Sequence, residues 1–312
     1  MRVLLAGATG AIGRPLVPML VAAGHEVLGT TRSERRAEAI RAAGAEPVVV
    51  DLTRLDDLRR EVHRARPEVV INQLTALPAV LDFRDRGVLA ATNRLRGEVG
   101  PVLAQTAADA GAGRLIAQSV AFFYAPVGGR VKEEGDPLID PPAGSAMAEG
   151  VEALTRLERS TLETPGIEGL VLRYGHFYGP GTHYPTEGGY AELVRRRRFP
   201  IVGPGTGTFS FVHRDDAAAA TVAAVERGAP GVYNVCDDDP APMHEWLPAY
   251  AEAVGARRPR RVPAWLARLA AGKEAAAMAT ALRGASNAKA KRELGWGPRY
   301  SSWRQGLREA LD

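Results

Sequence analysis

The chain has 312 residues, of which 46% are hydrophobic and 24% charged, a composition too apolar for a disordered protein. Single hydrophobic cores stop growing near ~250 to 300 residues, so we expect one large domain coupled to a smaller lobe. The net charge of +4 is spread along the chain apart from arginine runs at 195–198 and 257–261, which we interpret as solvated faces. This distribution does not indicate a nucleic-acid partner.

Cys236 is the only cysteine, which excludes an internal disulfide and a thiolate-rich metal site. We expect Cys236 to be a small buried apolar residue, and we expect no bound metal. No stretch approaches the ~18 consecutive apolar residues of a membrane helix, and the chain runs from Met1 into a strand pattern rather than a signal peptide. We therefore expect a cytoplasmic protein with no membrane partner.

Short runs rich in Val, Leu and Ile alternate with longer helical patterns in the first half of the chain. This alternation is typical of βαβ units, in which parallel strands are buried on both faces. The predicted strands are 3–6, 26–30, 47–50, 69–74, 115–119 and 170–174, and the predicted helices are 15–23, 34–43, 55–65, 93–110 and 149–162. The fold class is therefore α/β, a doubly wound parallel sheet of the Rossmann type.

The character of the sequence changes after Tyr174. Gly and Pro become dense at 175–189, which suits the wall of a binding cleft. An Ala-rich helix at 216–226 and a strand at 232–236 predict a return to the sheet, and the tail from His244 predicts a smaller, mostly helical lobe. We assign 1–174 with 209–236 to a dinucleotide-binding domain, and 175–208 with 237–312 to a substrate-binding lobe.

The run GATGAIG lies between a predicted strand and a predicted helix. Glycine permits positive φ and close approach of a ligand, while the helix N-terminus offers unpaired N–H groups and a partial positive charge to a phosphate. The spacing predicts a site for the pyrophosphate of a dinucleotide, and the alternative is a tight turn without a ligand. The turn residues expected to bind the cofactor are Gly7, Thr9, Gly10, Ala11, Ile12 and Gly13.

The end of the second predicted strand bears on the choice of cofactor, because NAD sites usually carry an Asp or Glu there. This chain has Thr31 and Arg32 instead, and Arg14 follows the last glycine. A guanidinium binds a 2′-phosphate in a bidentate manner, so we predict NADP rather than NAD, although both arginines could instead be solvated cations at helix ends. Asp51, followed by Leu52, is expected either to accept from the adenine amino group or to cap the next helix.

These residues and several later segments resemble the extended short-chain dehydrogenase/reductase superfamily, which includes nucleotide-sugar epimerases and dihydroflavonol-type reductases. The resemblance covers nearly the whole chain and rests on landmarks in the same order. They are GATGAIG, VINQLTA at 70–76, Thr92 with Asn93, QSVAFFYAP at 118–126, LRYGHFYGPG at 172–181, FVHRDD at 211–216, GVYNVCDDDP at 231–240 and AKRELGW at 290–296.

The resemblance implies a cofactor role for residues after the fourth and sixth strands. It implies a small-molecule substrate and homodimers formed through the helices after the fourth and fifth strands. Members normally carry a YxxxK pair on the helix before the sixth strand, yet 144–159 contain no Tyr and no Lys, which implies an atypical active site. The cofactor-binding residues expected on this basis are Leu74, Thr75, Ala76, Asn93 and Arg173.

Three residues are candidates for the missing catalytic role. His176 stands where relatives carry a substrate-contacting Asn, and it follows the end of a strand. Its imidazole titrates near neutrality, which suits a proton donor. The alternative is that His176 is a hydrogen-bonded histidine with no catalytic role. Tyr124 lies just beyond the fifth strand, where packing is the alternative. Ser119 stands one residue before Val120, which an ungapped alignment on Tyr124 places at the family's catalytic serine.

The first functional hypothesis is an NADP(H)-dependent oxidoreductase that reduces a small carbonyl substrate with a non-standard proton donor. The second is a nucleotide-sugar epimerase or dehydratase. The missing pair disfavours it, as does Thr208, at a position where relatives often set an Arg for the diphosphate. The third is a catalytically silent NADP-binding redox sensor, which the missing pair favours.

Overall fold

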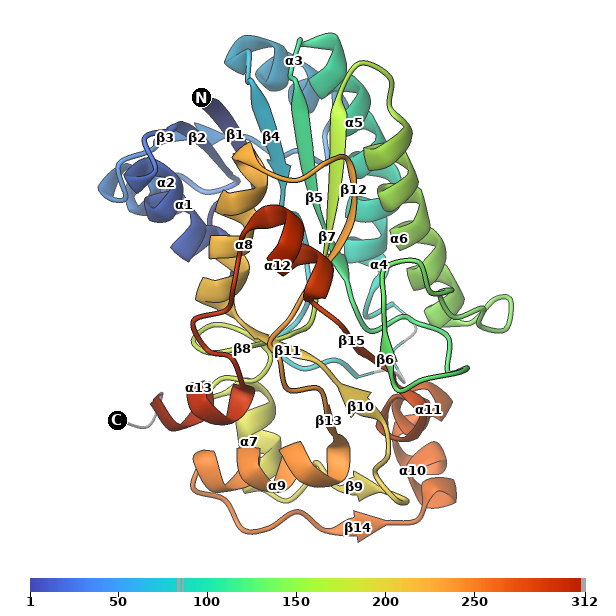
Figure 1. Cartoon of the computed structure of the whole chain (residues 1–312). Helices are drawn as coiled ribbons and strands as arrows, with labels where there is room; N and C mark the ends of the chain where they lie inside the picture. The colour runs from blue at the N-terminus through green and yellow to red at the C-terminus, as the bar shows by residue number, and fades with distance from the viewer. Residues whose placement is uncertain (83–84, 86, 310–312) are drawn as a thin grey trace.

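A seven-stranded sheet forms the centre of the computed structural model, which describes residues 1–82, 85 and 87–309 (Figure 1). Its strands are β1 (Arg2–Ala6), β2 (Glu26–Thr31), β3 (Glu46–Val49), β4 (Val69–Asn72), β5 (Arg114–Val120), β7 (Glu168–Tyr174) and β12 (Gly231–Val235). They lie in the order β12-β7-β5-β4-β1-β2-β3, and every pairing is parallel. The predicted doubly wound Rossmann architecture is confirmed.

Helices cover both faces of the sheet (Figure 1). One face carries α1 (Gly13–Ala22), α2 (Glu34–Ala42), α8 (Arg214–Glu226) and α12 (Ala288–Leu294), and the other carries α3 (Leu55–Ala65), α5 (Gly100–Asp109) and α6 (Ala146–Glu163). Every residue of β4 is buried, because a strand between two helical layers has no solvent face. In α3 the buried residues Leu58, Val62 and Ala65 recur at helical spacing.

The segment predicted as one helix at 93–110 contains a π-helical turn. It consists of α4 (Ala90–Arg94), a π-helix (Leu95–Val99) and then α5. A Cβ on Gly100 would lie 2.5 Å from Leu157 Cδ1, so α6 packs closely against this segment.

The C-terminal lobe is built around a buried aromatic core that includes Tyr184, Phe209, Phe211, Trp246 and Trp303. Its helices are α7 (Gly189–Arg195), α9 (Met243–Ala253), α10 (Ala264–Ala271), α11 (Lys273–Ala281) and α13 (Trp303–Glu309). Short strands form the pairs β9 (Ile201–Val202) with β14 (Arg261–Val262), β10 (Thr208–Phe209) with β13 (Ala241–Pro242), β8 (His176–Tyr178) with β11 (Phe211–His213), and β6 (Val131–Lys132) with β15 (Gly284–Ala285). Of all the helices in the described ranges, none has the length and apolar character needed to cross a membrane.

The expected boundary of the lobe needs correction at two places. Phe209 and Phe211, which were assigned to the dinucleotide-binding domain, belong to the aromatic core of the lobe. Residues 237–312 were assigned to the lobe, but α12 within this range packs on α8 and β12 of the sheet domain. Leu294 and Trp296 belong to the same core as Leu16 of α1, and the Trp296 indole N–H donates to the Asp216 carbonyl oxygen at 3.1 Å. The chain therefore returns to the sheet domain between α11 and α13.

A buried polar network joins β5, α6 and β7. Arg173 of β7 donates to both carboxylate oxygens of Glu158 on α6, at 2.8 and 2.6 Å. Ser119 of β5 donates to the same carboxylate at 2.5 Å, and Tyr124 accepts from Arg173 and donates to Asn234 at 2.7 Å. Less than a tenth of either charged side chain is exposed. Because the two opposite charges are paired and hydrogen-bonded, the burial of the ion pair is tolerated.

Replacing Arg173 by Met should leave the Glu158 carboxylate buried without its counter-charge, which typically costs ~3 to 5 kcal/mol. We expect urea unfolding to show a loss of that size, and the double variant Arg173→Met/Glu158→Met to recover a large part of it. Arg59→Met, at a half-exposed position of α3, is the matched control and should change stability by less than ~0.5 kcal/mol. A loss below ~1 kcal/mol for Arg173→Met would contradict the importance of this ion pair.

Candidate active site

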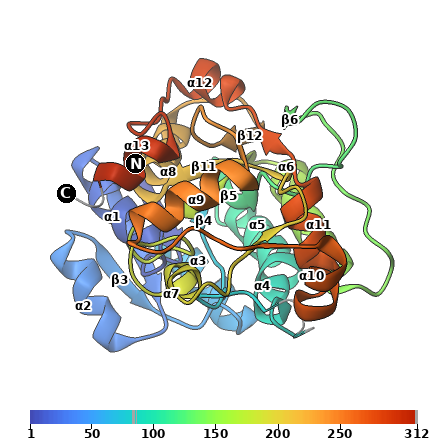
Figure 2. The ribbon, with the colours of Figure 1, turned by 90° about the horizontal axis from the view of Figure 1, so that it is seen from below.

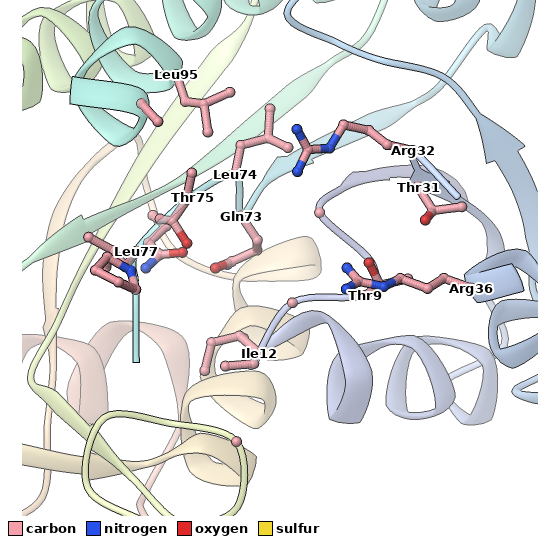
Figure 3. Close-up of a pocket in the computed structure, with 18 of the residues that line it drawn as sticks. Thr9, Ile12, Thr31, Arg32, Arg36, Gln73, Leu74, Thr75, Leu77 and Leu95 are labelled. Atoms are coloured by element: carbon pink, nitrogen blue, oxygen red, sulfur yellow. The ribbon is translucent and has the colours of Figure 1, made fainter. Parts of the chain in front are cut away.

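A pocket of about 980 Å³ opens at the carboxyl ends of β1, β2, β4 and β5 (Figure 3). Its wall consists mainly of the glycine turn after β1, the end of β2 with the start of α2, and the segment after β4. Residues between 177 and 189 close the remaining side. The pocket lies where the strand order reverses, the usual place for ligands in open α/β sheets.

The glycine turn leaves no room for a side chain at Gly7 or at Gly13. Gly7 has a φ of +94°, and a Cβ there would lie 2.9 Å from the carbonyl oxygen of Gln73. A Cβ on Gly13 would overlap the carbonyl oxygen of Gly7. Because α1 begins at Gly13, its free N–H groups and partial positive charge lie at the turn. Of the predicted turn residues, Gly7, Thr9, Gly10, Ala11 and Ile12 line the pocket, and Gly13 packs behind them.

Three arginines reach the pocket from the end of β2 and the first turn of α2. Arg32, Arg35 and Arg36 all line it, together with Thr31. The Arg32 and Arg36 side chains extend from this side toward the space beside the glycine turn (Figure 3). Arg14, which was expected to reach the same phosphate, is exposed and lies outside the pocket wall. The first turn of α2 therefore supplies the positive charge that we had assigned to Arg14.

Asp51 and Leu52 line the same end of the pocket. The Asp51 carboxylate accepts from the Thr53 hydroxyl at 2.8 Å and from the Thr53 N–H at 3.0 Å. These hydrogen bonds lower the pKa of Asp51, and the nearby charges of Arg32 and Arg54 lower it further. Asp51 is therefore ionised at neutral pH. It does not cap α3, whose N-cap residue is Arg54.

The segment after β4 forms the next part of the wall, which includes Leu74, Thr75 and Ala76. The Ala76 N–H donates to the Thr92 hydroxyl at 3.0 Å, which fixes this segment against α4. Gln73 also lines the pocket. Its Nε2 donates to the Tyr174 hydroxyl at 3.1 Å, whereas its buried Oε1 has no hydrogen-bond partner among the described residues. A buried acceptor without a partner offers a position for a ligand N–H or hydroxyl.

The far end of the pocket is lined by residues that we did not select from the sequence, namely Gln118 of β5, Phe177 of β8 and His183 in the following loop. His183 Nε2 lies 3.0 Å from the Pro78 carbonyl oxygen. A carbonyl can only accept, so this contact places a proton on Nε2 and leaves Nδ1 without one while the ring is neutral. Burial lowers the pKa of His183, so the ring is neutral at physiological pH.

The helix α6 offers no phenol or ammonium group to this pocket, because its sequence AMAEGVEALTRLERSTLE contains no Tyr and no Lys. Asn93, expected to bind the cofactor, does not line the pocket. Its Oδ1 is buried near Gly150 of α6, without a hydrogen-bond partner among the residues described.

Three further residues that we expected at the site, Ser119, Tyr124 and Arg173, are held in the buried network and do not line the pocket. Ser119 is turned to α6, whereas its neighbour Gln118 lines the pocket, because adjacent residues of a strand face opposite sides. Burial raises the pKa of Tyr124 despite the nearby charge of Arg173, so the phenol stays protonated. The structure therefore assigns these residues to packing rather than to the pocket.

His176 is enclosed by aromatic rings. It stacks on Phe122, with centroids 4.3 Å apart and ring planes 10° apart, and lies near Phe209 and Tyr184. It is 8% exposed, does not line the pocket, and its Nε2 has no hydrogen-bond partner in the described part of the chain. Burial lowers the pKa of His176 to about 3, so the ring carries no extra proton at neutral pH. This placement does not suit a proton donor, the role expected for His176.

Some of the residues that we missed carried a usable signal. Arg35 and Arg36 follow Ser33, the N-cap of α2, and the first turn of a helix after a strand end lies close to the pocket. Gln118 could have been selected as the neighbour of Ser119, because adjacent residues of a strand point to opposite faces of the sheet. No sequence pattern identifies His183, because its position depends on the fold of a Gly- and Pro-rich loop.

The chain is similar to known proteins over its whole length. The family model for the NAD dependent epimerase/dehydratase family matches residues 3–236. A 3-diazoavenalumate denitrifying reductase from a Streptomyces species is 46% identical over 312 residues, covering 98% of this chain and 99% of that protein. Two UDP-glucose 4-epimerases share the fold. The enzyme of Thermotoga maritima is 22% identical with a TM-score of 0.75, and the match covers 100% of this chain and 97% of that chain. The enzyme of Thermus thermophilus is 24% identical with a TM-score of 0.73, and the match covers 100% of this chain and 98% of that chain. The chain therefore belongs to the NAD dependent epimerase/dehydratase family.

Proposed function

We propose that this protein is an NADPH-dependent reductase that delivers hydride to a small aromatic acceptor without a proton from a Tyr–Lys pair. The observation that carries the proposal is the pocket, which runs from the glycine turn to His183, in a chain whose α6 has no Tyr and no Lys. When bound, the nicotinamide supplies the hydride. The residues of the chain bind and orient the reactants.

The pocket residues fit a dinucleotide. The turn has no room for a Cβ at Gly7 or Gly13, as suits a backbone that approaches a pyrophosphate, and the N-terminus of α1 offers N–H groups to its oxygens. The unpartnered Oε1 of Gln73 offers an acceptor for a cofactor N–H or hydroxyl. Leu74 and Thr75 would contact the nicotinamide ribose side.

Three arginines support NADPH over NADH. Arg32, Arg35 and Arg36 line the adenine end of the pocket, and in the described ranges none of them forms a salt bridge. Unpaired guanidinium groups can bind the dianionic 2′-phosphate through charge-assisted hydrogen bonds. Thr31 stands where an acidic residue would accept from the 2′-hydroxyl of NAD and would repel a phosphate.

Replacing Arg32 or Arg36 by Ala should weaken NADPH binding about tenfold or more, because a hydrogen bond to a charged group contributes ~1.5 to 3 kcal/mol. Binding of NADH should change less than about threefold. Fluorescence titration with both nucleotides measures this selectivity. Arg41→Ala is the matched control, because Arg41 lies on α2 outside the pocket wall and pairs with Glu38. Equal weakening of NADPH and NADH would argue against a 2′-phosphate site.

For the acceptor we propose an arenediazonium group. The relative at 46% identity is named as a denitrifying reductase of 3-diazoavenalumate. When a hydride reduces ArN₂⁺ to ArH and N₂, the hydride electron pair forms the new C–H bond, the C–N pair leaves with N₂, and no proton is consumed. A carbonyl instead gives an alkoxide that must take up a proton. A diazonium acceptor therefore explains how the pocket can work without an acid.

The far end of the pocket suits a planar cation. Leu77, Pro78 and Phe177 supply apolar and aromatic surface. The neutral ring of His183 adds no positive charge, and the arginines line the opposite end. The exposed carboxylate of Glu187 also lines this end, so the charge there favours a cationic acceptor.

With NADPH and 4-carboxybenzenediazonium we expect enzyme-dependent oxidation of NADPH, with one N₂ and one arene formed per NADPH. Aryl aldehydes and ketones should be turned over at least ~100-fold more slowly. Gly13→Val, which obstructs the glycine turn, serves with enzyme-free reactions as the control for uncatalysed reduction. Turnover of aldehydes but not of diazonium would overturn the diazonium assignment. Silence with every acceptor despite tight NADPH binding would favour the redox sensor.

A small carbonyl substrate is the second candidate, and the position of His183 in the pocket wall favours it. A protonated His183 could donate a proton to the alkoxide. Because the pKa of His183 is low, turnover would then rise as the pH falls. His183→Gln separates the two candidates. The diazonium proposal expects a change in kcat below about threefold, whereas the carbonyl candidate expects a loss of ~10² or more.

The buried His176 should make stability depend on pH. The unfolded ring binds a proton as the pH falls below ~6.5, whereas the folded ring, with a pKa of about 3, does not. Protonation of the unfolded ring therefore lowers the free energy of unfolding as the pH falls from 6.5 toward 3. The loss is ~2 kcal/mol at pH 5. Urea unfolding at pH 7 and pH 5 should show this loss of unfolding free energy in the wild type, and His176→Gln should lack it. The same pH dependence in both proteins would show that His176 is not held neutral.

A further inference from the structure

The two arginine runs, which we first interpreted as separate solvated faces, form one surface in the folded lobe. Arg195 donates to the Val254 carbonyl oxygen at 2.9 Å, and Arg197 donates to the Arg258 carbonyl oxygen at 3.4 Å. The strand β9, just after the first run, pairs with β14, which begins at the end of the second. The segment 195–202 is therefore fixed against 254–262.

The helix α10 continues this surface with exposed apolar side chains. Trp265 is 63% exposed, Leu266 41% and Leu269 77%. Positions i, i+1 and i+4 fall on one side of a helix, while the buried Ala267 faces the lobe. Figure 1 shows β14 and α10 at the bottom of the molecule, on the side turned away from the sheet domain, and Figure 2 shows α10 on this side from below.

The charge on this segment has a single sign. Residues 253–273 contain no Asp and no Glu. Their cations are all exposed, and none forms an ion pair among the described residues. They are Arg257, Arg258, Arg260, Arg261, Arg268 and Lys273. Together with Trp265, Leu266 and Leu269 they make up what we name the basic-apolar face.

We propose that the basic-apolar face binds the surface of an anionic lipid bilayer. A short helix that carries Trp and Leu on one side and is flanked by Arg is the arrangement of interfacial membrane segments. Trp belongs at the boundary of headgroups and acyl chains, Leu enters the acyl region, and the guanidinium groups contact anionic headgroups.

Two other occupants fit the face less well. Nucleic acid would use the arginines and could stack a base on Trp265, but it would leave Leu266 and Leu269 without an apolar partner. A second copy of the chain would bring like charges together about a two-fold axis. Three apolar side chains also fall short of the ~800 Å² that each partner buries in a standard interface. A bilayer accepts both the charge and the apolar side chains.

The fluorescence of Trp265 provides a direct test. The other three tryptophans, Trp246, Trp296 and Trp303, are each at most 5% exposed, so a blue shift of the exposed emission reports on Trp265. With vesicles of phosphatidylcholine and phosphatidylserine we expect a blue shift and co-sedimentation. Binding should be at least about tenfold tighter than to pure phosphatidylcholine and should weaken as salt screens the arginines.

Substitutions identify the surface that binds. Leu269→Ser and the pair Arg260→Gln/Arg261→Gln should each weaken vesicle binding about fivefold or more. The control pair Arg59→Gln/Arg64→Gln removes the same charge from exposed positions of α3 and should weaken it less than twofold. Thermal melting checks that each variant is folded.

Three outcomes would overturn the proposal. One is the absence of binding to the phosphatidylserine vesicles by the folded wild type. Another is binding to duplex DNA, lost in Arg260→Gln/Arg261→Gln, with no response to vesicles. The third is a dimer in solution that Leu269→Glu dissociates, with Trp265 already shielded in the absence of lipid.

Discussion

The contact between the glycine turn and the end of β4 is the constraint on which the rest of the site depends. Gly7 lies so close to the Gln73 carbonyl that a Cβ would come within 2.9 Å of its oxygen, and a Cβ on Gly13 would overlap the carbonyl oxygen of Gly7. This packing brings the N-terminus of α1 next to the segment that follows β4. In the proposed reductase, the pocket therefore joins the end that binds phosphate to the end where hydride is transferred, over one short stretch of sheet edge.

On the other side of the pocket, polar groups are used for packing rather than for proton transfer. The Glu158 carboxylate on α6 is saturated by Arg173 and Ser119, and Tyr124 is held between Arg173 and Asn234. The low pKa of His176 follows from the same principle, because a ring enclosed by aromatic side chains is more stable when neutral. A site of this kind suits an acceptor that needs a hydride and no proton.

The sequence predicted the sheet well because parallel strands buried on both faces appear as apolar runs, and the glycine turn because its backbone has few alternatives. It predicted the side chains of the reactive end poorly. Ser119 and Gln118 are neighbours on one strand, and a shift of one residue decides which of them faces the pocket. His176 is buried by the pairing of β8 with β11, which joins segments far apart in the chain. The loop that carries His183 folds through contacts such as that with Pro78, which no local pattern reveals.

The most direct test of the central claim is the isotope dependence of a single turnover with the diazonium acceptor. We predict a primary isotope effect of about 2 or more when deuterium is carried at the reactive C4 position of NADPH, and a solvent effect near 1 in D₂O, because hydride moves and no protein proton does. A solvent isotope effect of about 2 or more that disappears in His183→Gln would contradict the account. It would assign a proton-transfer step to His183.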